Sequence, residues 1–260
     1  MNPKAIFTNI VLAFVLSWLV WLPLCLHPND TKLFFLHPLG ALGPLVASVC
    51  TTFLFYKKEK TRILLASLLK FKPLKLWVGV LVVPFLMGLV ALGADNLLYG
   101  YPFEVTQIFT SKEFPNWSFV TWFMYNLIFI GYGEETGWRG FLLPEFQKKY
   151  SPIVATIFVT FIWAVWHVPL FFFRDGLMHM DVGGIIGWLM SLFTGSVIFT
   201  WLYNNSSKAI GLCALFHATV DVVFMANYQS SHINSYMGVS ITLLGIICFI
   251  LLLRNKQKVS

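Results

Sequence analysis

Long uncharged apolar runs, one after another, constrain the fold of this chain more than any other feature. Each run is long enough to cross a hydrocarbon core about 30 Å thick. The runs lie near residues 6–26, 38–56, 76–98, 117–138, 152–173, 184–203, 208–227 and 236–253. They predict an all-α, polytopic membrane protein with about eight transmembrane helices.

The composition of the 260 residues agrees with a membrane protein. Hydrophobic residues make up 58% of the chain and charged residues 11%, against about 45–50% and about 25% in ordinary soluble domains. The apolar runs occupy most of the sequence. We therefore predict a single integral-membrane domain over residues 1–260, with no separate soluble domain.

Basic residues predict the orientation, because Lys and Arg collect on the cytoplasmic side of membrane proteins. If both ends lie inside, the inner segments hold 14 of the 18 Lys and Arg residues, the outer loops hold three, and Arg139 is the remaining one. We therefore expect an N-in, C-in topology. The net charge of +7 is then explained by the inner membrane surface, and nucleic acid is not expected as a partner.

Residues 57–75 contain seven of these basic residues, interleaved with isoleucine, leucine and phenylalanine. This pattern is typical of an amphipathic helix that lies on the inner leaflet. We interpret the segment as a lipid-surface anchor.

The motif Glu-Glu-Thr-Gly-Trp-Arg at positions 134–139 carries the first candidate functional residues. Each ionised side chain near a bilayer centre costs on the order of 3 kcal/mol, so an intramembrane cluster of charges is a candidate site by default. Glu135 and Arg139 are four residues apart on one helix face and can form an ion pair. Glu134 is turned about 100° away, is left without a dedicated partner, and is therefore a candidate general base.

A structural interpretation of the same motif stays open at this point. An ion-pair network of these residues would also lock helices together. The glycines at positions 131, 133 and 137 fit close helix packing around the motif.

Two further runs contain histidines. His167 lies in the fifth run, two residues before Pro169, which cannot donate a hydrogen bond to the carbonyl of Val165 and so loosens the helix. His217 and Asp221 lie in the seventh run, four residues apart on one helix face.

The depths of these residues can be compared through the helical rise of 1.5 Å per residue. Counted from the inner ends of their helices, Glu134, His167 and His217 lie roughly 21, 22 and 14 Å deep. All three depths fall near the middle of a membrane, which predicts that the three residues share one site.

Taken in order, these motifs resemble those of the CPBP family of intramembrane proteases. The shared pattern is a double glutamate with arginine four after the second, a histidine four after an aromatic residue, and a histidine four before Asn or Asp. The family contains CAAX prenyl proteases of the Ras-converting-enzyme type and bacterial relatives linked to bacteriocin processing and self-immunity. The resemblance covers about residues 117–227, the expected catalytic core, and implies an eight-helix membrane peptidase.

The resemblance also implies roles for individual residues. The first glutamate acts as general base with the first histidine, the second histidine and the Asn or Asp complete the site, and the second glutamate and the arginine support it. The corresponding catalytic residues of this chain are Glu134, Glu135, Arg139, His167, His217 and Asp221.

Two positions depart from the family pattern. Trp163 stands where the family commonly has Phe, which we interpret as a mild aromatic exchange. Asp221 stands where the prenyl proteases have Asn. An ionised Asp has no proton to donate to an oxyanion, so Asp221 is expected to orient His217 or to help hold a cation.

Charge counting leaves a metal ion open. Glu134, Glu135 and Asp221 together with Arg139 carry a net charge of −2, which one divalent cation or two protonated histidines would balance. The family naming favours a metallopeptidase. The implied cofactor is then a divalent ion, zinc, with Glu134, His167 and His217 as its ligands.

Other classes of intramembrane peptidase lack their motifs in this sequence. It has no His-Glu-x-x-His helix, no Gly-x-Ser-Gly loop and no Gly-x-Gly-Asp motif. A nucleophilic pair of Cys213 and His217, four residues apart, stays an alternative. The outer-loop residues Arg174, Asp175, His179 and Asp181 are interpreted as a solvated turn rather than a metal site.

The sequence thus predicts an intramembrane endopeptidase that hydrolyses a membrane-associated or lipidated peptide or protein by activated water. The expected location is the plasma membrane of a bacterium, with the lipid bilayer and the substrate as partners. Two alternatives remain at this point. One is a proton- or ion-coupled transporter, since buried carboxylates and histidines also form proton relays. The other is a non-catalytic membrane protein that acts in bacteriocin immunity or as a scaffold.

Overall fold

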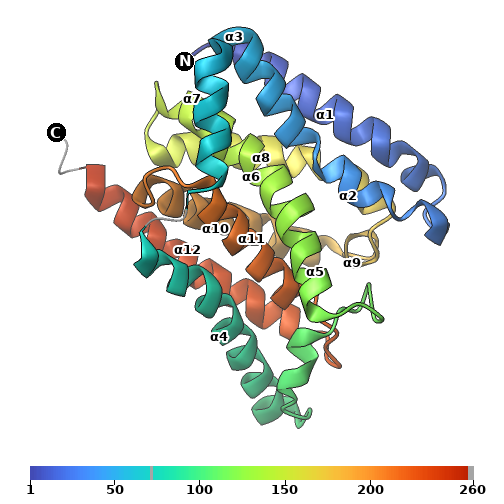
Figure 1. Cartoon of the computed structure of the whole chain (residues 1–260). Coiled ribbons are helices and arrows are strands. Elements are labelled where there is room, and N and C mark those ends of the chain that lie inside the picture. Colours follow the sequence, from blue (N-terminus) through green and yellow to red (C-terminus); the bar gives the residue numbers. More distant parts are fainter. Residues whose placement is uncertain (71–72, 257–260) are drawn as a thin grey trace.

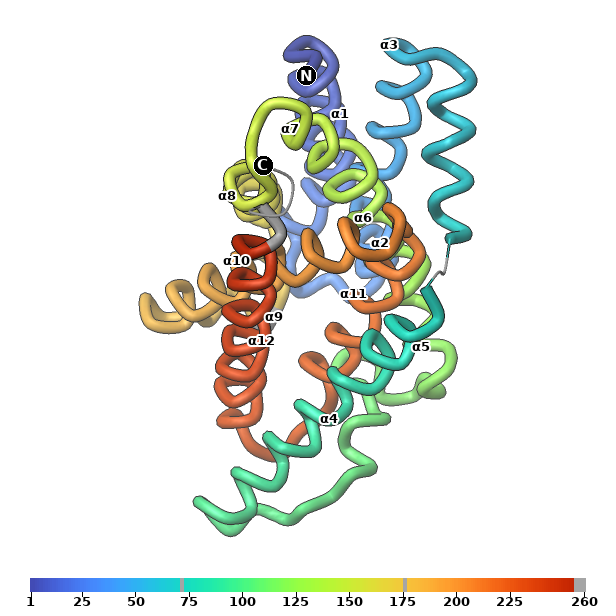
Figure 2. Tube along the Cα trace, turned by 90° about the vertical axis from the view of Figure 1, so that its left-hand side faces the viewer, coloured from blue at the N-terminus to red at the C-terminus, as the bar shows by residue number. Residues whose placement is uncertain are grey.

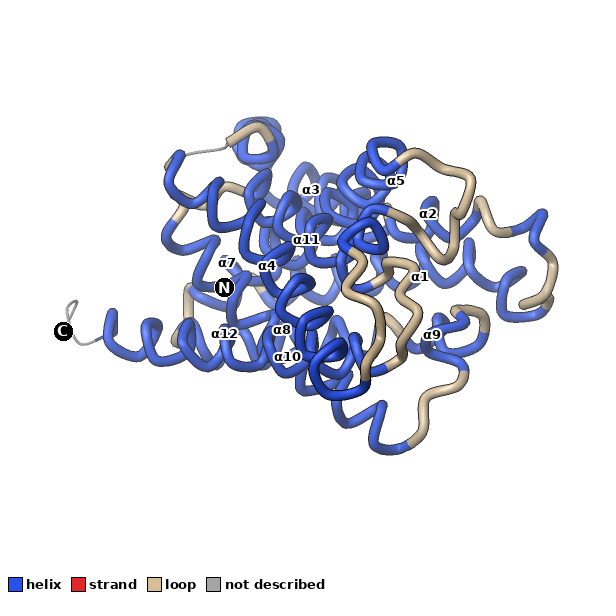
Figure 3. The backbone as a smooth tube through the Cα atoms, turned by 90° about the horizontal axis from the view of Figure 1, so that it is seen from below, coloured by secondary structure: helices blue, strands red, loops and turns tan. Residues whose placement is uncertain are grey.

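Helices dominate the computed structural model, which describes residues 1–70 and 73–256, without the side chains of residues 175–176 and 255–256. Of the described residues, 81% are helical. Within the described residues there is no strand, only an isolated bridge between Ser111 and Ala226 (Figure 3). The predicted all-α fold class is confirmed.

Seven helices are long. They are α1 (Pro3–Leu26), α3 (Gly43–Leu68), α4 (Leu74–Tyr99), α8 (Pro152–Trp166), α10 (Val182–Asn205), α11 (Ile210–Phe224) and α12 (His232–Lys256). The short α-helices are α2 (Leu36–Ala41), α5 (Phe119–Tyr125), α6 (Gly133–Gly137), α7 (Leu143–Gln147) and α9 (Asp175–Met178). Tight 3₁₀ turns occur at η1 (Thr31–Leu33), η2 (Val105–Phe109) and η5 (Val168–Phe172), and wide π-helical turns at η3 (Asn126–Tyr132) and η4 (Trp138–Leu142).

Six described segments are long and apolar enough to cross a membrane. They are Pro3–Leu26, Thr31–Leu68, Leu74–Tyr99, Pro152–Phe172, Val182–Asn205 and His232–Arg254. The two other predicted runs, 117–138 and 208–227, correspond to the succession of short helices from α5 to α7 and to α11. The chain is an integral membrane protein. The count of eight spans and the N-in, C-in orientation stay predictions.

Helix α11 lies at the centre of the bundle. It packs against α4, η3 and α10, and nearly every residue from Ile210 to Thr219 is buried. Around this centre, α1 pairs with α3 and α10 pairs with α12 (Figures 1 and 2). Because other helices surround α11, it does not need the roughly 20 residues of a helix that spans the lipid alone.

The two described chain ends lie toward the same end of the bundle. Helix α1 starts and α12 finishes there, at the upper left of Figure 1. A chain that crosses the membrane an even number of times has both ends on the same side. The arrangement therefore agrees with the predicted topology. Which end faces the cytoplasm stays a prediction.

The acidic motif lies on α6, between the two π-helical turns. Helices α5, α6 and α7 and the turns η3 and η4 follow one another without a break from Phe119 to Gln147, so the helical segment extends beyond the predicted run. Ser118 caps the start, where its Oγ accepts a hydrogen bond from the backbone N–H of Thr121 at 3.1 Å. Each π turn holds an extra residue and rotates the side chains that follow; such turns are frequent at functional sites.

Two glycines allow this segment to approach its neighbours closely. A Cβ at Gly131 would lie 2.4 Å from the carbonyl oxygen of Ala214 in α11, and one at Gly133 would lie 2.5 Å from that of Ala41 in α2. Since real Cβ atoms do not approach backbone oxygens that closely, α6 and η3 can contact α2 and α11 only with glycine here. The predicted role of these glycines in close packing is confirmed.

Helix α8 ends where the sequence predicts a break. Ser151 and Pro152 start it, with Ser151 Oγ accepting from the Val154 N–H at 3.4 Å. His167 is the first residue after the helix, and Pro169 lies in the 3₁₀ turn that follows. His167 therefore lies at the C-terminal end of α8.

The predicted amphipathic segment 57–75 is helical up to Leu68, while Phe71 and Lys72 lie outside the described residues. At Lys57 the backbone has φ 66° and ψ 180°, and α3 reverses direction there (Figure 1). This conformation is normally restricted to glycine and costs a larger residue on the order of 1–3 kcal/mol.

Lys57→Gly is expected to raise the free energy of unfolding by about 1 kcal/mol, because glycine adopts this conformation without Cβ strain. Lys58→Gly is the matched control. It removes the same charge from a helical position and should lower the free energy of unfolding by about 1 kcal/mol. Titration with SDS in mixed micelles measures both. Equal destabilisation by the two variants would contradict strain at Lys57.

Candidate active site

Glu135 is the centre of the polar cluster. Its Oε1 accepts one hydrogen bond from Arg139 Nη1 and one from His217 Nδ1, each at 2.9 Å. The Glu135 side chain is fully buried, and its Oε2 is one of the few buried side-chain atoms without a hydrogen-bond partner in the described part of the chain. The predicted Glu135–Arg139 pair is confirmed, and it also ties α6 to α11 through His217.

Arg139 is enclosed by further contacts. Its Nη2 donates to Ser196 Oγ on α10 at 2.8 Å. The guanidinium carbon lies 4.3 Å from the ring centre of Phe199 and 4.7 Å from that of Trp163. Aromatic faces attract cations, most strongly where water is excluded. These contacts hold the positive charge beside Glu135.

Glu134 has a different environment from its neighbour. Its Oε2 accepts hydrogen bonds from the indole N–H of Trp163 at 2.5 Å and from that of Trp138 at 3.3 Å. In the described part of the chain, no Lys, Arg or His is hydrogen-bonded to Glu134 and no hydrogen bond reaches Oε1. The prediction that Glu134 has no dedicated partner is therefore wrong. It holds only for cationic partners.

The two indoles explain what sequence reasoning missed. Trp138 follows Glu134 by four residues, so the helical spacing alone could have identified it as a neighbour. Trp163 belongs to α8, and the exchange of the usual Phe for Trp at this position is not the mild aromatic exchange that the sequence suggests. The indole supplies an N–H donor that phenylalanine lacks, so this exchange changes the hydrogen bonding of the acidic motif.

His167 is oriented by the backbone. Its Nδ1 lies 2.7 Å from the carbonyl oxygen of Trp163. A carbonyl only accepts, so Nδ1 carries the hydrogen and Nε2 of the neutral ring carries the lone pair. The ring lies between those of Trp163 and Trp188, with centroid distances of 5.5 and 5.6 Å.

His217 and Asp221 share one face of α11, as predicted. His217 Nδ1 donates to Glu135, which leaves Nε2 directed toward Asp221. The distance from Nε2 to Asp221 Oδ2 is 3.7 Å, which is too long for a hydrogen bond. The Asp221 side chain is 22% exposed, whereas the Glu135 side chain is inaccessible. Glu135, rather than Asp221, therefore orients His217.

Trp163 connects the three predicted motifs. Its indole N–H bonds Glu134, its carbonyl oxygen accepts from His167, and its ring centre lies 5.6 Å from that of His217. Side chains from α6, α8 and α11 therefore meet at one place. The expectation that the motifs form one cluster agrees with the geometry, while its depth in a membrane stays a prediction.

The donor side chains of the cluster do not provide the ligands that a metal ion needs. Within the described residues, no three or more His, Cys, Asp or Glu side chains are grouped so that they could hold a metal. Glu134, His167 and His217 share contacts with Trp163 but do not form such a group. The donors as placed do not fit a preformed zinc site, so the mechanism is derived from the protein groups alone.

The surroundings of Cys213 and Arg174 bear on two other interpretations of the sequence. Cys213 is fully buried, and its Sγ faces the carbonyl oxygen of Phe199 at 4.0 Å. Arg174 does not belong to a solvated turn: its Nη1 donates to Glu113 Oε1 at 2.8 Å, and both side chains are mostly buried. Asp181 instead caps α10, with Oδ1 accepting from the Gly184 N–H at 2.7 Å.

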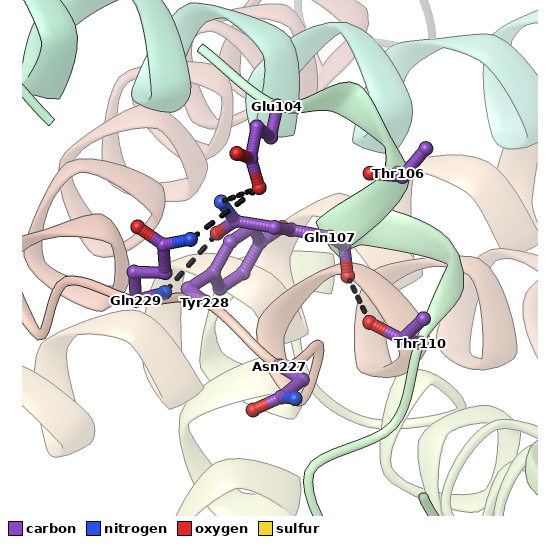
Figure 4. Close-up of a pocket in the computed structure, with 7 residues that line it drawn as sticks. All are labelled: Glu104, Thr106, Gln107, Thr110, Asn227, Tyr228 and Gln229. Atoms are coloured by element: carbon purple, nitrogen blue, oxygen red, sulfur yellow. Dashed lines mark hydrogen bonds between the residues drawn. The ribbon is translucent and has the colours of Figure 1, made fainter. Parts of the chain in front are cut away.

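One cavity lies away from this cluster. It has a volume of about 310 Å³ and is formed by η2 and the connection between α11 and α12 (Figure 4). Its polar side chains bond one another: Gln107 Nε2 donates to Glu104 Oε2 at 3.2 Å, and the Gln229 N–H donates to Gln107 Oε1 at 3.1 Å. The cavity contains none of the predicted site residues.

Comparison with known families identifies the part of the chain that carries the cluster. Residues 116–223 match the model of the type II CAAX prenyl endopeptidases, Rce1-like. All six predicted site residues lie in this range. The chain contains an Rce1-like domain of the CPBP family. The resemblance proposed from the sequence motifs is thereby confirmed.

A curated relative extends the similarity beyond the Rce1-like domain. The chain is 25% identical over 235 residues to CAAX prenyl protease 2 of Methanococcus maripaludis. The alignment covers 85% of this chain and 83% of that protein. The Rce1-like domain and this relative support intramembrane endopeptidase activity.

The geometry predicts a specific pattern of stabilities. Arg139→Ala leaves Glu135 with one charged partner fewer in a buried site and is expected to cost about 3–5 kcal/mol. Adding Glu135→Gln removes the uncompensated charge, so the double variant should recover a large part of that loss. Unfolding in mixed micelles measures the effect.

Glu134→Gln in the Arg139→Ala background is the matched control, because Glu134 does not contact Arg139. It is expected to give no recovery. If Glu135→Gln lowers the stability of Arg139→Ala further, Glu135 and Arg139 are not coupled in the way the geometry indicates.

Proposed function

We propose that this chain is an intramembrane endopeptidase in which Glu134 activates the attacking water. One observation carries this assignment: two adjacent carboxylates have different partners. Glu135 is engaged by Arg139 and His217, while Glu134 receives only neutral indole N–H groups, on Oε2. A general base needs an oxygen that can take a proton and an orientation that is fixed. Glu134 has both.

His167 is placed to assist Glu134. The Trp163 carbonyl holds Nδ1–H, so Nε2 of the neutral ring offers a lone pair. The same tryptophan bonds Glu134, which fixes both groups relative to one residue. We propose that His167 accepts a hydrogen bond from the water and directs it toward the substrate carbonyl.

His217 supplies positive charge where the oxyanion forms. A proton on Nε2 makes the ring an imidazolium, with Nδ1–H on Glu135 and Nε2–H free to donate. Asp221, at 3.7 Å from Nε2, adds a second negative charge near the ring. Fixed donors aimed at a developing negative charge give the largest single contribution in many enzymes.

The reaction balances without a further reagent. The water oxygen bonds to the peptide carbonyl carbon, one water proton passes to Glu134, and the carbonyl oxygen takes the displaced electron pair. When the tetrahedral intermediate collapses, the C–N bond breaks and the nitrogen takes the proton from Glu134. The first products are a carboxylic acid and an amine, and transfer of the acid's proton to the amine gives a carboxylate and an ammonium ion.

The surroundings of His167 support a substrate that arrives through the membrane. Phe172, in the turn after His167, is 58% exposed. The first half of α10, residues 182–191, contains no buried residue and projects from the bundle in Figure 2. The relative's name is CAAX prenyl protease 2, so we propose a membrane-embedded or lipidated peptide as the substrate class. The bacterial plasma membrane is the proposed location.

Glu134→Gln is expected to lower the rate of peptide cleavage at least 10²-fold, because an amide cannot act as a general base. Its stability should change by less than about 1 kcal/mol, since the amide oxygen still accepts from the indoles. The assay uses a prenylated peptide with a CAAX terminus in detergent micelles, beside the same peptide without the lipid.

Glu104→Gln, in the cavity shown in Figure 4, is the control and should keep full activity. Faster cleavage of the lipidated peptide is expected from the wild-type protein. Wild-type rates for Glu134→Gln would rule out Glu134 as the base, and equal rates for the two peptides would rule out recognition of the lipid.

Metal dependence is tested separately. Because the donor groups do not form a three-ligand site, treatment with 1,10-phenanthroline followed by desalting is expected to leave cleavage unchanged. Metal analysis of the treated protein completes the measurement. Loss of activity that zinc restores would support the zinc ion implied by the family resemblance and would contradict a mechanism run by protein groups alone.

A further inference from the structure

A second cavity, of about 230 Å³, lies at the end of the bundle where the chain begins. Four lysines line it together with one glutamate, a net charge of +3. The lysines are Lys60, Lys70, Lys148 and Lys208. They come from three segments far apart in sequence: the second half of α3 with the two residues that follow it, the residue after α7, and the turn between α10 and α11. We refer to it as the lysine cavity.

Three of the four lysines form no ion pair with the residues that the structure describes. Lys148 bonds Glu145, which also accepts from the Asn2 backbone N–H at 3.2 Å. Lys60, Lys70 and Lys208 are exposed and take part in no described ion pair. Like charges gathered in one hollow raise the local potential and attract an anion.

The backbone that carries Lys208 is strained. Ser207 and Lys208 have φ values of 54° and 62°, and with Lys57 they are the only described non-glycine residues with positive φ. Lys57 directly follows Tyr56, which also lines the lysine cavity. Strained residues of this kind cost on the order of 1–3 kcal/mol and cluster at ligand sites.

The remaining wall of the lysine cavity is mostly apolar. Ile63, Leu64 and Phe141 line it, and one face of α3 from Lys60 to Ser67 supplies much of the surface. Ile63 is 50% exposed and Leu69, the residue after α3, is 77% exposed. An occupant therefore meets a cationic rim on one side and hydrocarbon on the other, the two chemistries of an anionic amphiphile.

We propose that the lysine cavity binds the phosphate headgroup of an anionic phospholipid, with its acyl chain along the exposed apolar residues of α3. A free phosphate lacks the apolar part that this wall would contact. The site is separate from the Glu134 cluster. Gly140, the residue after Arg139, forms part of its wall. A bound lipid therefore stabilises the helical segment that carries the acidic motif.

The inference is independent of the proposed peptidase function, and thermal stability in detergent tests it. Phosphatidylglycerol should raise the melting temperature of the wild-type protein, and phosphatidylcholine with the same chains should not. The double variant Lys60→Gln/Lys208→Gln should lose at least half of the increase. Native mass spectrometry, which counts retained phosphatidylglycerol, provides a second readout that does not depend on the variant's own stability.

Lys58→Gln/Lys149→Gln is the matched control, because it removes two exposed lysines that do not line the cavity. It should keep the increase. Four results would overturn the proposal: no increase for the wild-type protein, an equal increase with phosphatidylcholine, an equal loss in the control variant, or the same increase with glycerol phosphate alone. The last result would identify a soluble anion as the occupant.

Discussion

The hydrogen bonds to one oxygen atom, Glu135 Oε1, determine the arrangement of the whole cluster. Arg139 and His217 both donate to it at 2.9 Å, and both are buried. A buried carboxylate is tolerated only when it is paired and hydrogen-bonded. Here the pairing fixes the tautomer of His217, joins α6 to α11, and holds the arginine at Glu135. The chemistry proposed for Glu134 depends on this difference in partners between the two glutamates.

The helical segment that carries the acidic motif packs unusually closely against neighbouring helices. Gly131 and Gly133 bring it against the backbones of α11 and α2, and π turns flank the motif on both sides. Every such turn changes which side chains face the interior. The result places Glu134 beside the indoles of Trp138 and Trp163, so that aromatic N–H groups, not cations, position the base.

Much of this could be predicted from the sequence because helical spacing is local. The Glu135–Arg139 pair, the shared face of His217 and Asp221, and the end of α8 near Pro169 all follow from residues within four positions of one another. Contacts between helices could not be predicted in that way. The bond from Trp163 to Glu134 and the burial of Arg174 beside Glu113 depend on packing of segments distant in sequence.

A double-mutant cycle between Glu135→Gln and His217→Asn tests the central claim most directly. If Glu135 orients His217, the two changes should be coupled by at least about 1.5 kcal/mol in the free energy of unfolding, while Glu134→Gln and His217→Asn, which break no hydrogen bond between them, should be coupled more weakly. Unfolding in mixed micelles gives both values. Additivity for the Glu135 pair, or equal coupling for both pairs, would contradict the division of roles between the two glutamates.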